Sequence, residues 1–293
     1  MRALVAAALL FLAAAAFSAE PFAPVEPQGP LVPPSLPAER RPVQPAERAL
    51  WRVRPLIGAS TMRLGGLEHF GDASIARLRL DWSKFHGVTA GNTVRRKIDF
   101  ALVEGLEASF QVDPLVSVAM KATAVRSTRG NLRTVGTAGT TRIEDNWDFS
   151  TEMLLVMAGA GFNLPLAEKM RLNITLFLGA GFADVTIDHR ERTDVTSGSA
   201  IRQGTIDATG TAFIPEFTME LERDLTESLA VGAGLGYRFG GLEAFRNRYA
   251  NSANLFSTSP EREAGYPVRD GRGALLTSDY GGLFLVLFFT ARG

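Results

Sequence analysis

The stretch SLAVGAGLGYRFG, residues 228–240, constrains the fold more than any other part of the sequence, because its two sides alternate strictly. One side is apolar and the other is largely glycine: Leu229, Val231, Ala233, Leu235, Tyr237 and Phe239 face one way, and Gly232, Gly234, Gly236 and Arg238 face the other. A period of two is typical of a β-strand, whose successive side chains point to opposite faces. Glycines weaken a strand, so we expect something crowded on the glycine side.

The same alternation continues along most of the chain. An apolar face opposes a face of small, polar and charged residues in 74–82, 98–110, 115–124, 171–184 and 211–221. Two further apolar segments, 150–162 and 275–289, are apolar on both faces over several residues, so their register stays open. Strands that are apolar outside and polar inside are typical of a transmembrane barrel.

The connections between these segments alternate in length. Short turns lie at 111–114, 164–169 and 222–228, and long polar connections lie at 85–95, 127–147, 189–206 and 240–273. Three short turns and four long loops predict eight strands, with both ends of the chain on the short-turn side of the barrel. Outer-membrane barrels have short periplasmic turns and long external loops. The sequence therefore predicts an all-β fold, an antiparallel transmembrane β-barrel of eight strands with a Pro-rich N-terminal extension.

The N-terminal region has a different composition. Residues 1–18 carry one basic residue, an apolar run and a small-x-small site, which predicts a secretory signal peptide. Residues 19–48 are rich in proline and predict a periplasmic linker, with contact to a cell-wall or periplasmic partner as the alternative to a plain spacer. We interpret 49–73 as a segment at the barrel mouth and 74–293 as the outer-membrane β-barrel.

Residues 74–290 resemble small outer-membrane β-barrels of the OmpA/OmpX/OmpW type, on the strand pattern, VGAGLGYRFG and the closing DYGGLFLVLFF. The resemblance implies location in the outer membrane of a Gram-negative-type bacterium, with outer-membrane lipids and the assembly machinery as partners. The chain departs from the pattern in ending on TARG rather than an aromatic residue and in having no downstream peptidoglycan-binding domain. Glu104 falls on the lipid side of its strand, so we expect a bulge or an interfacial position there.

The lumen of such a barrel should hold charges of both signs. An eight-stranded barrel is only wide enough for side chains to fill it, so the glycines make room for large inward side chains. The predicted lumen charge network is structural and has four residues of each sign: Arg77, Arg79, Lys121, Arg238, Glu107, Glu216, Glu220 and Asp279. Paired, these side chains form a plug of salt bridges rather than a pore.

Motifs for chemistry are scarce. The chain has no cysteine, which excludes disulfides and thiolate chemistry, and its equal numbers of basic and acidic residues, 31 each, argue against a nucleic-acid partner. The glycine-rich stretches do not complete a phosphate-binding motif. Asp188 and His189 are adjacent on a strand and point to opposite faces, so they form no catalytic dyad by themselves. We expect no catalytic residue, cofactor or metal.

Basic residues gather near the predicted outer rim: Arg95, Arg96, Lys97, Arg126, Arg129, Arg133, Arg190 and Arg192. Guanidinium groups pair well with phosphate, so lipopolysaccharide phosphates are one predicted partner. The alternative is a solvated rim balanced by neighbouring acids, Glu144, Asp145, Glu191 and Asp194.

Three functions remain open. The sequence favours a non-enzymatic outer-membrane barrel that acts in envelope structure or surface contact through its loops and tail. The alternative is a narrow pore or a transport route for small hydrophobic molecules, which the partly apolar lumen would permit. A barrel hydrolase acting on lipid or peptide is the least favoured.

Overall fold

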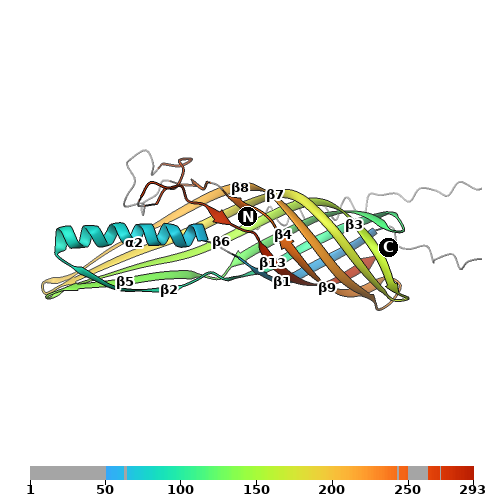
Figure 1. Ribbon diagram of the computed structural model, residues 1–293, viewed down its shortest axis with the longest axis horizontal. Helices are drawn as coiled ribbons and strands as arrows, with labels where there is room; N and C mark the ends of the chain where they lie inside the picture. The colour runs from blue at the N-terminus through green and yellow to red at the C-terminus, as the bar shows by residue number, and fades with distance from the viewer. Residues whose placement is uncertain (1–50, 63–64, 243, 250–262, 271) are drawn as a thin grey trace, which may run out of the picture.

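The computed structural model describes residues 51–293 except 63–64, 243, 250–262 and 271. The predicted signal peptide and Pro-rich linker lie outside the described residues. Eight strands close into a ring (Figure 1), namely β1 Trp51–Thr61, β3 Phe100–Asp113, β4 Val116–Ser127, β6 Thr141–Ala167, β7 Met170–Val195, β8 Gly198–Asp224, β9 Leu229–Arg238 and β13 Gly282–Arg292.

Every neighbouring pair in this ring is antiparallel, in the order β1-β3-β4-β6-β7-β8-β9-β13. The first and last strands close it, with Ile57 opposite Leu287. The ends of the ring also meet, since the Trp51 amide donates to the Gly293 carbonyl at 3.4 Å. Closure satisfies the backbone of every ring strand within the sheet, as a lipid environment requires. The predicted fold class, an eight-stranded antiparallel barrel, is confirmed.

The predicted strand 74–82 is wrong, because these residues belong to the helix α2, Gly65–His86. Leu67, Phe70, Leu78 and Trp82 are all buried, and their spacing of three, eight and four residues follows the turns of a helix. The helix ends at His86 because Gly87 adopts a left-handed conformation with φ of 60°. Within the described residues, no helix has both the length and the apolar character needed to cross a membrane.

The strand that replaces 74–82 in the ring is β1, inside the segment 49–73 that we interpreted as a barrel-mouth segment. The sequence obscures this strand because Pro55 lies in its middle and cannot donate a ladder hydrogen bond. Its inward residues include Arg52 and Arg54, both buried. The ring therefore begins at Trp51, earlier than the predicted barrel boundary at residue 74.

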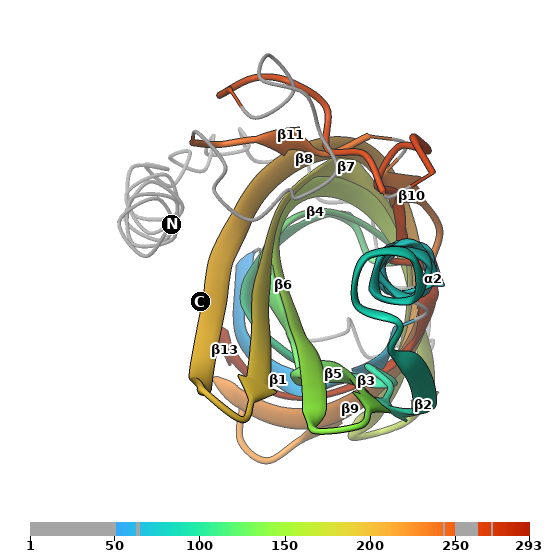
Figure 2. The same cartoon turned by 90° about the vertical axis from the view of Figure 1, so that its left-hand side faces the viewer.

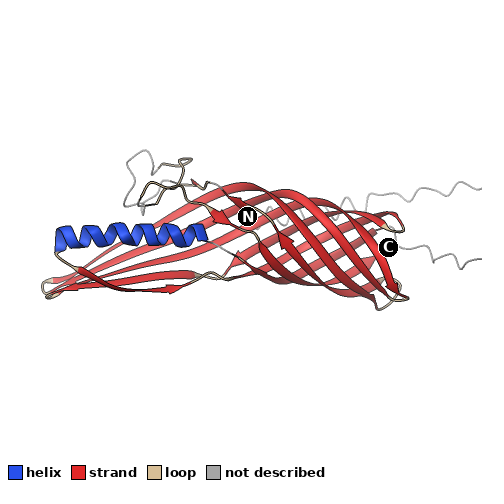
Figure 3. Cartoon of the chain, in the orientation of Figure 1, coloured by secondary structure: helices blue, strands red, loops and turns tan. Residues whose placement is uncertain are grey.

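The three longest strands continue far beyond the barrel (Figure 3). β6, β7 and β8 are 27, 26 and 27 residues long; β6 extends into the region 127–147, and β7 and β8 cover most of the region 189–206, both of which were predicted as loops. Short strands add to this extension: β2 Thr89–Arg96 and β5 Gly130–Ala138 extend the sheet from β6, and β11 Arg246–Asn247 pairs with β8. β10 Gly241–Leu242 pairs separately with β12 Ser278–Asp279.

We call the extended parts of β6, β7 and β8, with β2, β5 and α2, the distal lobe. In the end-on view of Figure 2, α2 lies beside β2, on the side of the ring away from the extended β8. The Phe70 ring of α2 packs edge-on against Trp147 of β6, with centroids 6.1 Å apart. The Trp82 indole of α2 donates to Glu191 of β7 at 3.3 Å. The lobe thus has a packed apolar interior between the sheet and the helix, which is continuous with the buried apolar residues of the barrel.

The glycine face of β9 is crowded, as expected from its sequence. A Cβ atom on Gly236 would lie 2.2 Å from Cζ of Phe284, and one on Gly232 would lie 2.3 Å from Cζ of Phe288. Both aromatic residues come from β13 and are buried. Only glycine leaves these inward rings the space that they occupy.

Candidate functional site: the lumen charge network and the distal lobe

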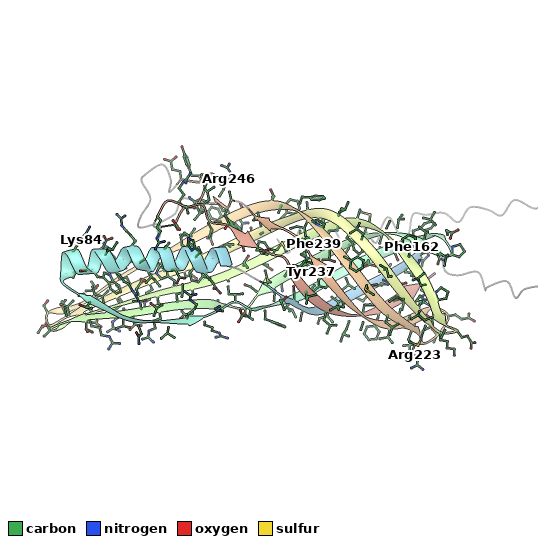
Figure 4. The ribbon with its side chains drawn as sticks, viewed as in Figure 1. Lys84, Phe162, Arg223, Tyr237, Phe239 and Arg246 are labelled. Atoms are coloured by element: carbon green, nitrogen blue, oxygen red, sulfur yellow. The ribbon has the colours of Figure 1, made fainter. Side chains whose placement is uncertain are left out.

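An apolar belt surrounds the outside of the barrel. Large apolar side chains are exposed on every ring strand, for example Leu176, Leu178 and Phe182 on β7. At about 3.4 Å per residue and a tilt of about 40°, the run of β7 from residue 172 to 182 rises about 26 Å, close to the band of about 25 Å in membrane barrels. Figure 4 shows Tyr237 and Phe239 on this outer surface, where their rings pack 4.6 Å apart.

The lumen behind this belt is filled with charged side chains. Near its centre, Glu216 of β8 is fully buried between two cations. It accepts a hydrogen bond from Lys121 of β4, and its Oε2 accepts from Nε and a terminal nitrogen of Arg238 at 3.0 and 2.8 Å. The Lys121 ammonium also lies 4.3 Å from the ring centroid of Phe177. This group, Lys121, Glu216 and Arg238, is the upper lumen cluster.

A second group lies closer to the short-turn end and has Arg54 of β1 at its centre. The Arg54 guanidinium donates to Glu107 at 3.1 Å, to Glu220 at 2.5 Å and to Glu222 at 2.9 Å. These carboxylates come from β3 and β8, so the arginine crosses the lumen and ties non-adjacent strands together. Glu222 also accepts from Thr290 of β13 at 2.8 Å.

Basic residues continue this network to the short-turn end of the barrel. Arg292 of β13 donates to Glu222, and it also donates to Asp224 at 2.6 Å. Arg171 of β7 donates to Asp224 at 2.6 Å and lies 3.4 Å from Glu222. Together these ion pairs link β1, β3, β7, β8 and β13 across the part of the lumen that is closer to the short turns.

Five of the eight predicted network residues lie in these lumen clusters: Glu107, Lys121, Glu216, Glu220 and Arg238. Arg77 and Arg79 do not, because they belong to α2; Arg77 is exposed beside Asp81 and Arg79 donates to Thr93 of β2. Asp279 is exposed and accepts from the Gly281 amide, since it belongs to β12 rather than β13. These three assignments are wrong.

Sequence reasoning missed the other members of the network, Arg52, Arg54, Arg171, Glu222, Asp224 and Arg292. Arg52 and Arg54 alternate with apolar residues in WRVRPLI, and this alternation is by itself a signal for a strand. Glu222 continues the even-numbered inward series of Glu216 and Glu220, but we assigned it to a turn. The alternation of inward and outward residues that identifies Arg52, Arg54 and Glu222 as lumen residues was therefore present at the ends of these strands.

The distal lobe contains a second buried polar group. His189 of β7 and Asp145 of β6 are both buried, with His189 Nε2 2.5 Å from Asp145 Oδ1. Asp145 also accepts from the Trp147 indole at 2.6 Å, and the Trp147 and His189 rings lie 4.1 Å apart. Asp188 points to the outer face and accepts from Thr205 at 2.7 Å, so it is not the partner of His189. The cluster fastens β6 to β7 beneath α2.

Four of the eight basic residues of the predicted rim form ion pairs with acids: Arg95, Arg126, Arg133 and Arg192. Arg126 pairs with Glu104 at 3.2 Å and Glu152 at 2.5 Å on the outer face of β3, β4 and β6. Glu104 therefore lies at the upper end of the belt, and the β3–β4 register shifts only near residue 112, at the far end of the hairpin. A groove of about 1020 Å³ lies beneath this group on the outer wall, lined mainly by outward residues such as Leu106 and Ala122.

Other acids hold basic side chains farther out on the lobe. Arg95 of β2 pairs with Asp72 and Glu68 of α2. Arg133 donates to Glu144 at 2.7 Å, and this hydrogen bond holds the pKa of the Glu144 carboxyl below its usual range. Among the described residues, no group of three or more histidines and acids is arranged to hold a metal ion.

Comparisons with known proteins give only distant likenesses. No protein-family model and no curated protein matches the chain. It is similar to the attachment invasion locus protein Ail of Yersinia pestis, with TM-score 0.32 and 10% identity over 84% of this chain and 98% of that one. It is likewise similar to the outer membrane protein OprG of Pseudomonas aeruginosa, with TM-score 0.32 and 11% identity over 84% and 96%. The outer membrane protease OmpT of Escherichia coli has TM-score 0.25 and 6% identity over 86% and 99%.

The class of protein rests on the structure itself, because likenesses of this size carry no argument about function. A closed ring of eight antiparallel strands has an apolar outer belt and a charged interior. A lipid bilayer accepts strands only in such a closed form. The chain folds as a small transmembrane β-barrel.

Proposed function

We propose that this chain is a non-enzymatic outer-membrane barrel that acts in surface contact through its distal lobe. One observation carries the proposal: the ring strands close around a lumen that contains ion pairs, while three of the same strands continue into a folded lobe with a packed interior. Strands that served only to enclose the ion pairs of the lumen would end at the membrane surface. The folded extension of β6, β7 and β8 therefore supports a role outside the membrane.

Two further features support this role. The outer faces of β6 and β7 in the lobe carry charged residues on alternate positions, such as Glu144, Arg190 and Arg192, while their inner faces pack under α2. The arginines that face acids, such as Arg126, support a balanced rim rather than a lipopolysaccharide phosphate site. We also propose, as the sequence predicts, that the Pro-rich tail, residues 19–48, lies in the periplasm.

The location of the lobe is tested with single cysteines, because the chain has none. Ser197→Cys lies in the exposed β7–β8 turn of the lobe, and Glu227→Cys lies in the exposed β8–β9 turn at the opposite end. In intact cells, a membrane-impermeant maleimide should label the first variant and label the second only after the outer membrane is opened. Labelling in the reverse order would contradict the proposed orientation.

Surface contact is tested with a variant that loosens the lobe and leaves the ring intact. Trp82→Ala removes a buried α2 side chain, whereas Lys84→Ala changes an exposed residue of the same helix (Figure 4). Cells displaying the wild type should self-associate or adhere to a cell layer more than vector-only cells do. Trp82→Ala should reduce this contact while the barrel still migrates as a folded species on gels, and Lys84→Ala should not. Equal contact by all three proteins and by vector-only cells would refute the proposal.

A further inference from the structure

Arg52 of β1 differs from the other basic side chains of the lumen. Its guanidinium is 3% exposed and forms no ion pair with any described carboxylate. Its terminal nitrogens donate at 3.2 Å each to neutral amides, Asn163 Oδ1 and Gln111 Oε1. Arg54, Arg171 and Arg292 lie close enough to repel it, and Glu222 attracts it without forming an ion pair. A buried cation that has no direct ion pair and is surrounded mainly by other cations is unfavourable in a lumen of low dielectric constant.

Beside Arg52, two asparagines leave further polar atoms unpartnered. Asn163 of β6 and Asn173 of β7 are register partners that point inward and are 3% and 2% exposed. The Asn163 amide nitrogen, the Asn173 amide nitrogen and oxygen, and Arg52 Nε are buried without a hydrogen-bond partner among the described side chains and backbone. Buried polar groups are nearly always paired. Three of these four atoms carry N–H donors, so a hydrogen-bond acceptor placed between them would satisfy most of the group.

The charge balance of the lumen points the same way. Within the barrel, leaving out the distal lobe, the inward side chains of the ring strands comprise six bases and five acids: Arg52, Arg54, Lys121, Arg171, Arg238 and Arg292 against Glu107, Glu216, Glu220, Glu222 and Asp224. Every base except Arg52 lies in an ion pair with one of these acids. Six bases and five acids leave an excess of one positive charge, and Arg52 is the base that has none of these acids as its partner.

We propose that the lower lumen binds one compact monovalent inorganic anion, for which chloride is the probe, between Arg52, Asn163 and Asn173. One negative charge neutralises the excess, and three N–H donors supply its coordination. The ligand is compact because Arg52 already spans the lumen from β1 to β6 and leaves little room beside it. Inorganic phosphate is larger and carries more than one negative charge at neutral pH, so it fits this site less well.

The first test measures thermal unfolding of the full barrel in detergent micelles, in sodium chloride and in sodium gluconate at equal ionic strength. Gluconate is too large for the site. Above the dissociation constant, the wild-type midpoint should rise with the logarithm of the chloride concentration, as one site requires, by about 5 °C or more at about 100 times the dissociation constant. Arg52→Met and Asn173→Leu should abolish the difference between the two salts. Arg223→Met, which changes an exposed arginine of β8 outside the lumen (Figure 4), should keep it.

A wild type that responds equally to both salts, or an Arg52→Met variant that retains the full chloride response, would overturn the inference. Because a lumen variant can fail to refold, crystals of the wild type soaked in sodium bromide provide a test without mutation. An anomalous peak should lie within hydrogen-bonding reach of Arg52 Nε and the Asn163 and Asn173 amides. Ordered water without anomalous signal at that position would refute the anion site.

Discussion

Replacing Glu216 with glutamine tests how far the upper lumen cluster stabilises the barrel. The substitution keeps the shape of the side chain and removes its charge, so Lys121 and Arg238 both lose their carboxylate partner. Glu216 is fully buried. The Lys121 ammonium lies over the ring of Phe177 and the Arg238 guanidinium lies over the ring of Phe284, so little water can solvate these cations once the carboxylate is gone. Breaking one buried ion pair costs about 3–5 kcal/mol. With two cations left uncompensated, we expect about 4–5 kcal/mol, which is on the order of a 1000-fold change in the unfolding equilibrium.

Urea unfolding in lipid vesicles, followed by tryptophan fluorescence, measures this loss. Trp51 reports on the ring, whereas Trp82 and Trp147 report on the distal lobe. Glu227→Gln, in an exposed turn, is the matched control and should leave the transition unchanged. Adding Lys121→Met to Glu216→Gln removes one of the stranded cations and should restore part of the stability. A Glu216→Gln barrel within about 1 kcal/mol of the wild type would refute the reasoning.

Three further predictions concern the belt, the glycine face and the lobe. Leu235→Arg places a charge on the outer face of β9 and should cost about 2–4 kcal/mol in vesicles; a neutral effect would contradict the lipid-facing assignment. Gly236→Ala should cost about 1–3 kcal/mol by displacing Phe284 and crowding the Phe217 carbonyl, and Phe284→Leu should relieve the part due to the ring; equal stability in all backgrounds would contradict the packing. The Glu144 ion pair contributes stability above the unfolded pKa of this group and loses it as the pH falls through the lowered folded pKa. Arg133→Ala should therefore raise the pKa of Glu144, and an unchanged NMR titration would count against this pairing.

Seven ring strands could be predicted from the sequence because lipid outside and charge inside impose a period of two. The strand β1 was missed because Pro55 interrupts its ladder and two arginines make it look unlike a membrane segment. The helix α2 was misread because Leu78 and Trp82 fit a period of two as well as a helix. The buried Leu67 and Phe70 upstream would have decided between these periods.

The extended hairpins were predicted as loops because their outer faces are polar. Their inner positions nevertheless alternate, with Ile143, Trp147 and Phe149 all buried. The lumen clusters were only partly predictable for a different reason. Arg54 on β1 meets Glu220 on β8, and these strands are separated in the ring by β9 and β13. Contacts across a lumen depend on the closure and tilt of the whole barrel, which local alternation does not encode.

Electrical recording tests the central claim, that the ion pairs close the lumen and leave the lobe to act outside. Purified wild-type protein is inserted into a planar bilayer, with Glu216→Gln measured beside it. We predict no steady, large conductance for the wild type, because the lumen clusters join β1, β4, β7, β8, β9 and β13 across the interior. Stable open channels in the wild type would contradict the closed lumen and favour the pore instead.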